Sequence, residues 1–248
     1  MTLKQFFEDH PKAALAFSGG VDSAYLLYAA RKYGADICAY YVKTPFQPQF
    51  EYEDAVTLAH QLQVPLTTIA LDVLEDPSVA ANPQNRCYYC KNRIFTAITK
   101  QAEKDGYPLI IDGTNASDDR SDRPGMQALE ELQVASPLRI CGLTKDEIRK
   151  LSKQAGLFTH NKPAYACLAT RIPAGTTITA ELLAKTERSE AFLRSLGFSD
   201  FRIRLLGDSA KIQVTEAQLP LLLSHRQQIL EKLTEDYTSV LLDLEVRQ

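Results

Sequence analysis

Short runs of consecutive apolar residues alternate with amphipathic segments along the first part of the chain. The apolar runs occupy residues 13–17, 37–42, 66–71 and 108–112. Continuous apolar runs of this length are typical of strands that are buried on both faces. Segments 24–32 and 51–62 follow the first two runs and predict helices. Strands that alternate with helices predict a parallel sheet, in which ligands bind beyond the carboxyl ends of the strands.

One more helix precedes a change of pattern in the last third of the chain. Thr144, followed three residues later by Glu147, has the pattern of a capping box and predicts a helix over residues 143–154. The next elements are expected in the order helix, strand, strand, helix and strand. They are placed at residues 179–196, 201–205, 210–214, 216–233 and 239–244. Gly207 and Asp208 predict a hairpin turn between the two middle strands.

Length and composition indicate an ordinary globular protein. The 248 residues, 45% hydrophobic and 24% charged, allow one large or two modest domains. We expect an α/β domain at residues 1–165 and a smaller C-terminal α+β domain at residues 166–248. The sequence has no apolar run long enough for a membrane span and no signal-peptide pattern at its start, which predicts a cytoplasmic protein. A net charge of −3 argues against a nucleic-acid partner.

The hexapeptide Ser-Gly-Gly-Val-Asp-Ser, which begins at Ser18, joins the first strand to a helix. Backbone N–H groups and the positive helix end converge there, which favours a phosphate ligand. Gly19 and Gly20 allow close approach of the backbone, and Ser18 and Ser23 supply hydroxyl donors. Asp22 offers a hard oxygen ligand for a Mg²⁺ ion that the phosphates also hold. The loop lacks the Lys of a Walker A motif, and an ordinary strand-to-helix turn is the alternative.

Two other loops follow predicted strands and are expected at the same edge of the sheet. Thr44 comes after the second strand, and the tetrapeptide Asp-Gly-Thr-Asn, which begins with Asp112 and Gly113, comes after the fourth. These positions predict that Thr44, Asp112 and Gly113 lie beside the phosphate ligand. Asp, Gly and Asn also favour simple turns, so the tetrapeptide alone does not decide between the two interpretations.

Three of the five cysteines are candidates for chemistry. Cys87 and Cys90 form a CxxC motif before a predicted helix at residues 91–100, and Cys167 lies near the expected domain boundary. An odd number of cysteines without a secretion signal argues against a disulfide framework. From the residues alone, the motif fits a redox pair, a zinc site completed by His160, or a four-iron cluster with one iron left open.

The phosphate loop is similar to the PP-loop of the ATP pyrophosphatases, which cleave ATP between its α and β phosphates. Over residues 13–244 the chain resembles the LarE family. The most specific parts are residues 18–23, Arg123-Pro124-Gly125, residues 167–176, Glu190 with residues 193–198, and residues 201–204. The resemblance implies a parallel sheet of the PP-loop, adenine nucleotide α-hydrolase-like type, with ATP and Mg²⁺ as bound ligands. It also implies a homo-oligomer.

The LarE family consists of ATP-dependent sulfur transferases of nickel-pincer cofactor biosynthesis. The resemblance implies that a carboxylate of pyridinium-3,5-biscarboxylic acid mononucleotide is adenylated and that sulfur then displaces AMP. Members with one cysteine, at the position of Cys167, give up its sulfur. This sequence adds Cys87 and Cys90 and so resembles a three-cysteine subgroup, in which a 4Fe-4S cluster carries an extra sulfide from a donor. All three cysteines are therefore expected to be cluster ligands and catalytic.

Four charged residues complete the expected site. Arg202 and Arg204 alternate with apolar residues on a predicted strand, so both face one side, and Arg suits phosphate and carboxylate groups. The resemblance implies that Arg171, Arg202 and Arg204 bind substrate and that Glu190 is catalytic. The pattern alone also allows a solvated strand face for Arg202 and Arg204, and surface ion pairs for Arg171 and Glu190.

Two other functions remain open from the sequence. A tRNA thiolation enzyme of the PP-loop superfamily would use the same loop, although the negative net charge argues against it. A non-catalytic ATP-sensing module would bind nucleotide without adenylating a substrate. Release of AMP and pyrophosphate that depends on a substrate separates a sensor from an enzyme.

Overall fold

The computed structural model describes residues 1–118 and 124–247, which form two compact units. The first unit comprises Met1–Val73 and Asn85–Lys162, and the second comprises Leu74–Gln84 and Pro163–Gln248. The sequence placed the division between residues 165 and 166 and assigned Leu74–Gln84 to the first domain. In the structure the chain crosses between the units three times, after Val73, after Gln84 and after Lys162.

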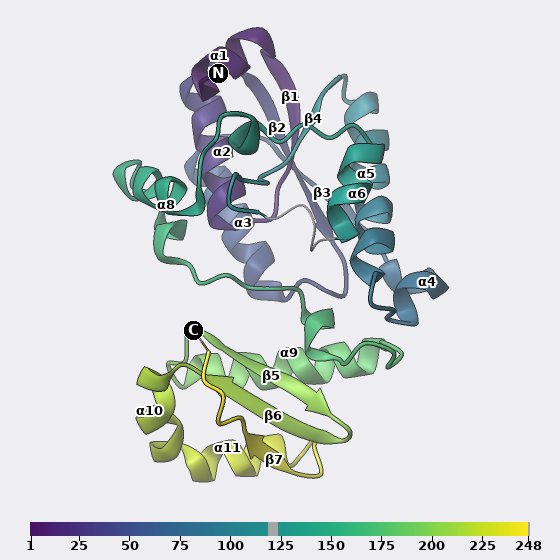
Figure 1. Ribbon diagram of the computed structural model, residues 1–248, viewed down its shortest axis with the longest axis vertical. Coiled ribbons are helices and arrows are strands. Elements are labelled where there is room, and N and C mark those ends of the chain that lie inside the picture. Colours follow the sequence, from purple (N-terminus) through teal and green to yellow (C-terminus); the bar gives the residue numbers. More distant parts are fainter. Residues whose placement is uncertain (119–123, 248) are drawn as a thin grey trace. The chain divides into compact units, whose positions relative to one another are not determined.

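A four-stranded parallel sheet in the order β3-β2-β1-β4 forms the centre of the first unit (Figure 1). Its strands are β1 (Lys12–Ala16), β2 (Asp36–Lys43), β3 (Leu66–Ala70) and β4 (Ile110–Ile111). Its helices are α1 (Leu3–Asp9), α2 (Val21–Lys32), α3 (Gln49–Gln61), α5 (Arg86–Lys104), α6 (Pro124–Glu131), α7 (Pro137–Ile140) and α8 (Lys145–Gln154). The predicted parallel α/β sheet is confirmed.

Helices cover both faces of this sheet. Successive side chains of each strand point to opposite sides and so pack into two separate cores. Leu15 and Tyr41 pack into a core with residues of α1, α2 and α8. Ala14 and Tyr40, their neighbours in the strands, pack into a second core with residues of α5 and α6. Figure 1 shows these two groups of helices on either side of the sheet. The carboxyl ends of the strands are thereby left for the loops.

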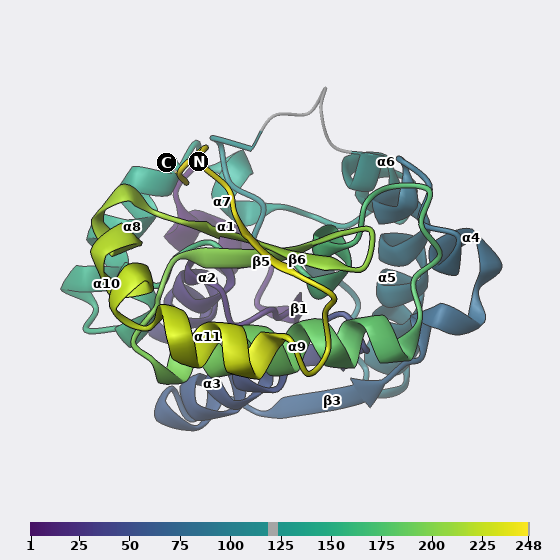
Figure 2. The ribbon, with the colours of Figure 1, turned by 90° about the horizontal axis from the view of Figure 1, so that it is seen from below.

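The second unit contains a smaller sheet in the order β5-β6-β7, with α9 and α11 along one face (Figure 2). Its strands are β5 (Phe201–Leu206), β6 (Ser209–Val214) and β7 (Val240–Leu242), and its helices are α4 (Pro77–Ala80), α9 (Ala180–Ser195), α10 (Leu219–Ser224) and α11 (Arg226–Leu233). Strands β5 and β6 are antiparallel and β6 and β7 are parallel. The predicted α+β class is confirmed.

Two helix predictions need correction. The helix predicted over residues 216–233 is divided, because the backbone of His225 has φ −98° and ends α10 before α11 begins. The helix predicted at residues 91–100 begins earlier, at Arg86, and ends at Lys104. Cys87 and Cys90 therefore lie within α5, as its second and fifth residues, instead of preceding it.

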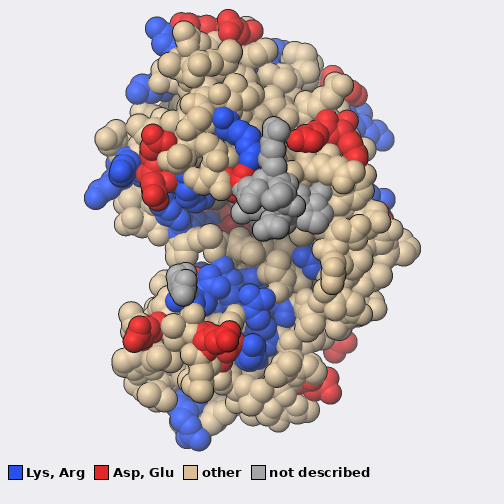
Figure 3. Space-filling model, in the orientation of Figure 1, with Lys and Arg blue, Asp and Glu red and all other residues tan. Residues whose placement is uncertain are grey.

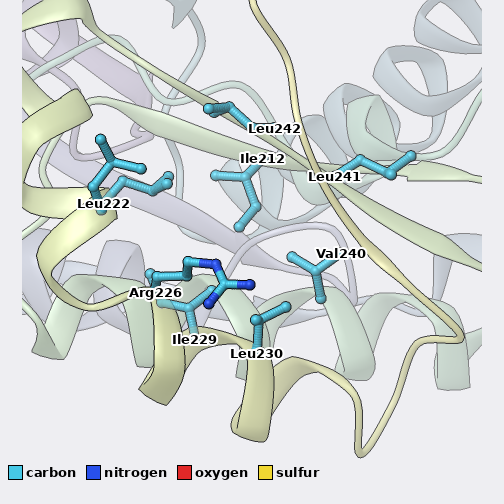
Figure 4. A pocket seen from close by; sticks show the side chains of 9 residues that line it. Ile212, Leu222, Arg226, Ile229, Leu230, Val240, Leu241 and Leu242 are labelled. Carbon is cyan, nitrogen blue, oxygen red and sulfur yellow. The ribbon is translucent and has the colours of Figure 1, made fainter.

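An apolar pocket of about 230 Å³ lies between the helices α10 and α11 and the strands β6 and β7 (Figure 4). Aliphatic side chains form its wall, together with Arg226. The aliphatic residues are Ile212, Leu222, Leu223, Ile229, Leu230, Val240, Leu241 and Leu242. Within the described residues, no helix is both long and apolar enough to span a membrane.

Candidate active site

The loop between β1 and α2 presents unsatisfied backbone donors at the carboxyl edge of the sheet. Gly20 is the N-cap of α2, and no side chain caps this helix end. The first-turn amides of Val21, Asp22 and Ser23 have no carbonyl partner within the helix. Free amides together with the positive end of the helix dipole make this point suitable for an anion.

Gly19 has a conformation and surroundings that require glycine. Its φ is +72°, which L side chains rarely adopt. A Cβ atom at this position would lie 3.1 Å from the Cβ of Ala55 and 3.3 Å from the carbonyl oxygen of Glu51, both in α3. The loop therefore packs closely against the first half of α3, which fixes its path.

The two serines of the loop differ in exposure. Ser23 is buried, whereas Ser18 is exposed. Their hydroxyl groups are 3.1 Å apart, and the Ser23 hydroxyl also donates to the carbonyl of Gly20 at 3.2 Å. Ser23 thus orders the loop from inside, and Ser18 presents a hydroxyl group to solvent.

The loop after β4 contacts the phosphate loop directly. A Cβ atom on Gly113 would lie 2.9 Å from the backbone nitrogen of Ser23, so only glycine fits without a shift of the backbone. The Asp112 carboxylate accepts hydrogen bonds from the Thr114 amide at 3.2 Å and from the Ser136 hydroxyl at 2.7 Å. The Thr114 hydroxyl donates to it as well. Asp112 therefore shapes the loop that carries Gly113.

Thr44 lies in a buried turn after β2. Its hydroxyl donates to Oε1 of Gln47 at 2.6 Å and accepts from the Phe46 amide at 3.1 Å. The side chain is only 2% exposed. Contact between Thr44 and a nucleotide stays a prediction.

Asp22 makes two contacts with residues distant in sequence. Nζ of Lys145, the first residue of α8, lies 2.5 Å from one carboxylate oxygen, and Nδ2 of Asn115 donates to the other at 3.4 Å. The sequence predicts the start of α8 correctly, because Thr144 and Glu147 form the expected capping box. No local pattern links this helix to Asp22, so the sequence analysis missed Lys145.

Two of the three candidate cysteines lie in the first unit of the chain, and the third lies in the second unit. Cys87 is exposed and Cys90 half-buried near the start of α5, and Sγ of Cys87 lies 3.9 Å from Nη2 of Arg86. Cys167 is in the second unit, where it precedes the short 3₁₀ helix Leu168–Arg171. No three or more His, Cys, Asp or Glu residues gather into a metal site among the residues described. The cluster stays a prediction.

Glu190 is the centre of a buried network in the second unit. Its carboxylate accepts from Nε of Arg171 at 2.6 Å, from the hydroxyl of Tyr165 at 2.5 Å and from the amide of Ile203 at 3.0 Å. Arg171 is 1% exposed and also donates to the hydroxyl of Thr170 at 2.7 Å. The polar contacts of Arg171 are therefore made within the protein.

Arg202 and Arg204 extend this network along β5. Nη1 of Arg202 donates to the Phe201 carbonyl at 2.6 Å, and the Arg204 guanidinium donates to Oε1 of Gln213 at 2.7 Å and to the Thr170 carbonyl at 3.0 Å. Burial, followed by the positive charge of Arg171, lowers the pKa of Arg202 to about 10 and also lowers the pKa of Arg204. Basic side chains gather over this part of the second unit (Figure 3).

Comparison with known proteins decides the family. The chain matches no protein-family model. It is 31% identical over 220 residues to the pyridinium-3,5-bisthiocarboxylic acid mononucleotide synthase of Lactiplantibacillus plantarum, a match that covers 88% of this chain and 80% of the synthase. The chain belongs to the LarE family of ATP-dependent sulfur transferases. An uncharacterized protein of Synechocystis sp. is 36% identical over 218 residues, which are 88% of this chain and 81% of that protein.

A weaker similarity connects this LarE-family chain with tRNA-specific 2-thiouridylases. The Clostridium botulinum protein is 28% identical over 181 residues, which cover 60% of this chain and 51% of the thiouridylase. This similarity agrees with the predicted PP-loop fold.

Not every part of the LarE resemblance is placed by the structure. Arg123 of the Arg-Pro-Gly motif lies outside the described residues. Gly125 of the same motif lies in α6 close to Lys91 of α5, since a Cβ atom there would lie 2.6 Å from Cδ of that lysine. The sequence analysis also missed Tyr165, whose hydroxyl shares the Glu190 carboxylate with Arg171.

Proposed function

We propose that this LarE-family chain adenylates a carboxylate of pyridinium-3,5-biscarboxylic acid mononucleotide and replaces the AMP with sulfur. The observation that carries the proposal is the uncapped start of α2 beside Gly19 and Gly20, in a chain that is 31% identical to a synthase of the corresponding bisthiocarboxylic acid. The free amides favour binding of a phosphate group. The name of the relative indicates that its product contains sulfur in place of carboxylate oxygen.

In the first step, the loop holds the triphosphate of ATP and the substrate carboxylate attacks the α-phosphorus. An oxygen–phosphorus bond forms to the carboxylate, and the bond from the α-phosphorus to the bridging oxygen breaks. The amides of Val21, Asp22 and Ser23 bind the pyrophosphate that leaves. Positioning and stabilisation of charge supply most of the acceleration in such transfers.

Asp22 is the residue that would hold the Mg²⁺ accompanying ATP. Its carboxylate lies in the first turn of α2 and is partly exposed, and carboxylate oxygens combined with phosphate oxygens suit this ion. Mg²⁺ would neutralise part of the phosphate charge when bound. The hydroxyl of Ser18 is exposed at the same loop and would donate to a phosphate oxygen.

Arg202 and Arg204 would bind the anionic groups of the pyridinium nucleotide. Their depressed pKa values reflect burial next to other arginines, so an anion bound there would relieve the repulsion between cations. Arg204 is more exposed than Arg202 and is better placed to contact a ligand. We assign Arg171 and Glu190 a positioning role, because they bind each other and Glu190 also accepts a hydrogen bond from the hydroxyl of Tyr165, two residues before Cys167.

Cys87, Cys90 and Cys167 would hold a 4Fe-4S cluster. The first two are three residues apart in α5 and therefore share a helix face. Cys167 would supply the third ligand. Such a cluster would carry the sulfide that attacks the acyl adenylate and expels AMP.

The test is release of AMP and pyrophosphate by the purified chain with ATP and a candidate acceptor. We expect release with the pyridinium biscarboxylate nucleotide and none with bulk tRNA. Release only with tRNA would contradict the proposal in favour of tRNA thiolation. Binding of ATP without release in either mixture would contradict it in favour of a nucleotide sensor.

A further inference from the structure

Lys145 lies at the phosphate loop although it is far from the loop in sequence. The loop itself has no lysine, unlike a Walker A loop, where a lysine contacts the phosphates. The ammonium group of Lys145 is 2.5 Å from the carboxylate of Asp22, and one third of its side chain is exposed. We propose that Lys145 is the cation of this phosphate site and contacts the β- and γ-phosphates of ATP. This inference rests on the proposed use of ATP.

The backbone of Lys145 is fixed next to the loop after β4. Its amide donates to the hydroxyl of Ser117 at 3.0 Å, and the amide of Ala116 donates to the carbonyl of Leu143 at 2.8 Å. The same loop carries Gly113, which packs against Ser23 in α2. The starts of α2 and α8 are therefore joined through one loop, so the Lys145 side chain originates at a defined point.

Electrostatics explains why a cation is needed there. Asp22 places a negative charge in the first turn of α2, where it opposes the binding of phosphate. Lys145 balances that charge. An ammonium group has three donors, and the contact with Asp22 uses one of them. The flexible four-carbon stem lets the same group reach a phosphate bound at the helix end.

Lys162, another lysine of the first unit with strong ionic contacts, is a weaker candidate. Its Nζ lies 2.8 Å from Oε1 of Glu51 and 2.7 Å from Oδ2 of Asp54. Two carboxylates hold this cation at α3, and its side chain is 13% exposed. Lys145, with one carboxylate partner among the described contacts, is the lysine that can exchange that partner for phosphate.

The experiment measures equilibrium binding of ATP, pyrophosphate and AMP to the purified chain in metal-free buffer. We expect Lys145→Met to weaken binding of ATP and pyrophosphate about tenfold to a hundredfold, the range for one lost charge-assisted hydrogen bond. AMP lacks the β- and γ-phosphates, so its affinity is expected to stay within about twofold. Lys145→Arg, which keeps the charge, is expected to retain most of the affinity. Lys150→Met, an exposed position on the same helix, is the matched control.

A second comparison separates contact with phosphate from simple neutralisation of Asp22. In an Asp22→Asn background, Lys145→Met is still expected to cost about tenfold in ATP affinity. No loss in that background, or equal losses for AMP and ATP, would overturn the proposal. Lys145→Gln repeats the series if the Met variant does not fold.

These outcomes are distinguishable from failure of the proposed function, because binding of ATP needs no pyridinium substrate. A wild-type chain that binds ATP but releases no pyrophosphate would contradict the proposed function alone. A wild-type chain that binds neither ATP nor pyrophosphate would overturn both proposals.

Discussion

Arg171 and Glu190 form a fully buried ion pair, with 2.6 Å between Nε and Oε1 and side-chain exposures of 1% and 2%. Arg171 follows Cys167 along the chain, and Tyr165, which precedes it, donates to the same Glu190 carboxylate at 2.5 Å. The backbone on both sides of Cys167 is thus tied to one carboxylate of α9. We infer that Glu190 helps to fix the position of the cysteine through these two side chains.

Glu190→Gln is expected to destabilise the chain strongly. The substitution leaves the positive charge of Arg171 buried without its counter-charge, which typically costs about 3–5 kcal/mol. Denaturant unfolding measures the loss. Asp236→Asn is the matched control, since Asp236 pairs with the exposed Arg188 at 2.9 Å and such surface pairs are worth about 0–1 kcal/mol. A Glu190→Gln variant as stable as the control would show that the pair is not a main support of this segment.

Arg204→Ala is expected to weaken binding of the pyridinium nucleotide and to leave binding of ATP unchanged. Loss of a charge-assisted hydrogen bond to a substrate anion costs about 1.5–3 kcal/mol, so KM for the nucleotide should rise by about tenfold or more. KM for ATP should stay within about twofold, because the phosphate loop is in the other unit. Arg226→Ala, at the exposed end of α11, is the control. Equal changes for both substrates would contradict a specific role for Arg204.

The phosphate loop could be predicted because its determinants are local. The segment from Lys12 to Val21 contains a buried strand, two glycines and the start of a helix. Each of these features can be predicted from neighbouring residues. The positive φ of Gly19 and its contact with Ala55 give the structural reason for the first glycine. Lys145 could not be found in this way, because its contact with Asp22 joins residues 123 positions apart.

Local sequence patterns also could not predict that Leu74–Gln84 belongs to the second unit. Asn82 has φ +53°, is 1% exposed, and its Nδ2 donates to the carbonyl of Pro173 at 2.8 Å. The Gly175 amide donates back to the carbonyl of Asn82 at 2.8 Å. Asn is common in turns, so an Asn in the sequence is normally taken for a loop residue. Nothing in the local sequence distinguishes a buried Asn that joins two distant segments.

Gly113→Ala is expected to lower the magnitude of the free energy of ATP binding by more than it lowers the free energy of unfolding. The added Cβ would lie 2.9 Å from the Ser23 amide nitrogen and 3.2 Å from its Cα, so the loop after β4 must move away from α2. Equilibrium ATP binding and denaturant unfolding are measured on the same variant. Gly125→Ala is the control, because the atoms nearest to its added Cβ belong to the flexible side chain of Lys91. Unchanged ATP affinity in Gly113→Ala would mean that this contact does not shape the phosphate loop.

Single alanine substitutions of Cys87, Cys90 and Cys167 are each expected to abolish stable binding of iron and acid-labile sulfide after anaerobic reconstitution. A cluster with three protein thiolates cannot lose one and keep its occupancy, since cysteine thiolates hold these clusters. Cys141→Ala is the matched control, because Cys141 packs against the core of the first unit and burial raises its pKa. The control should bind iron like the wild type. Binding of zinc alone, or full multi-turnover activity of Cys87→Ala, would refute the cluster.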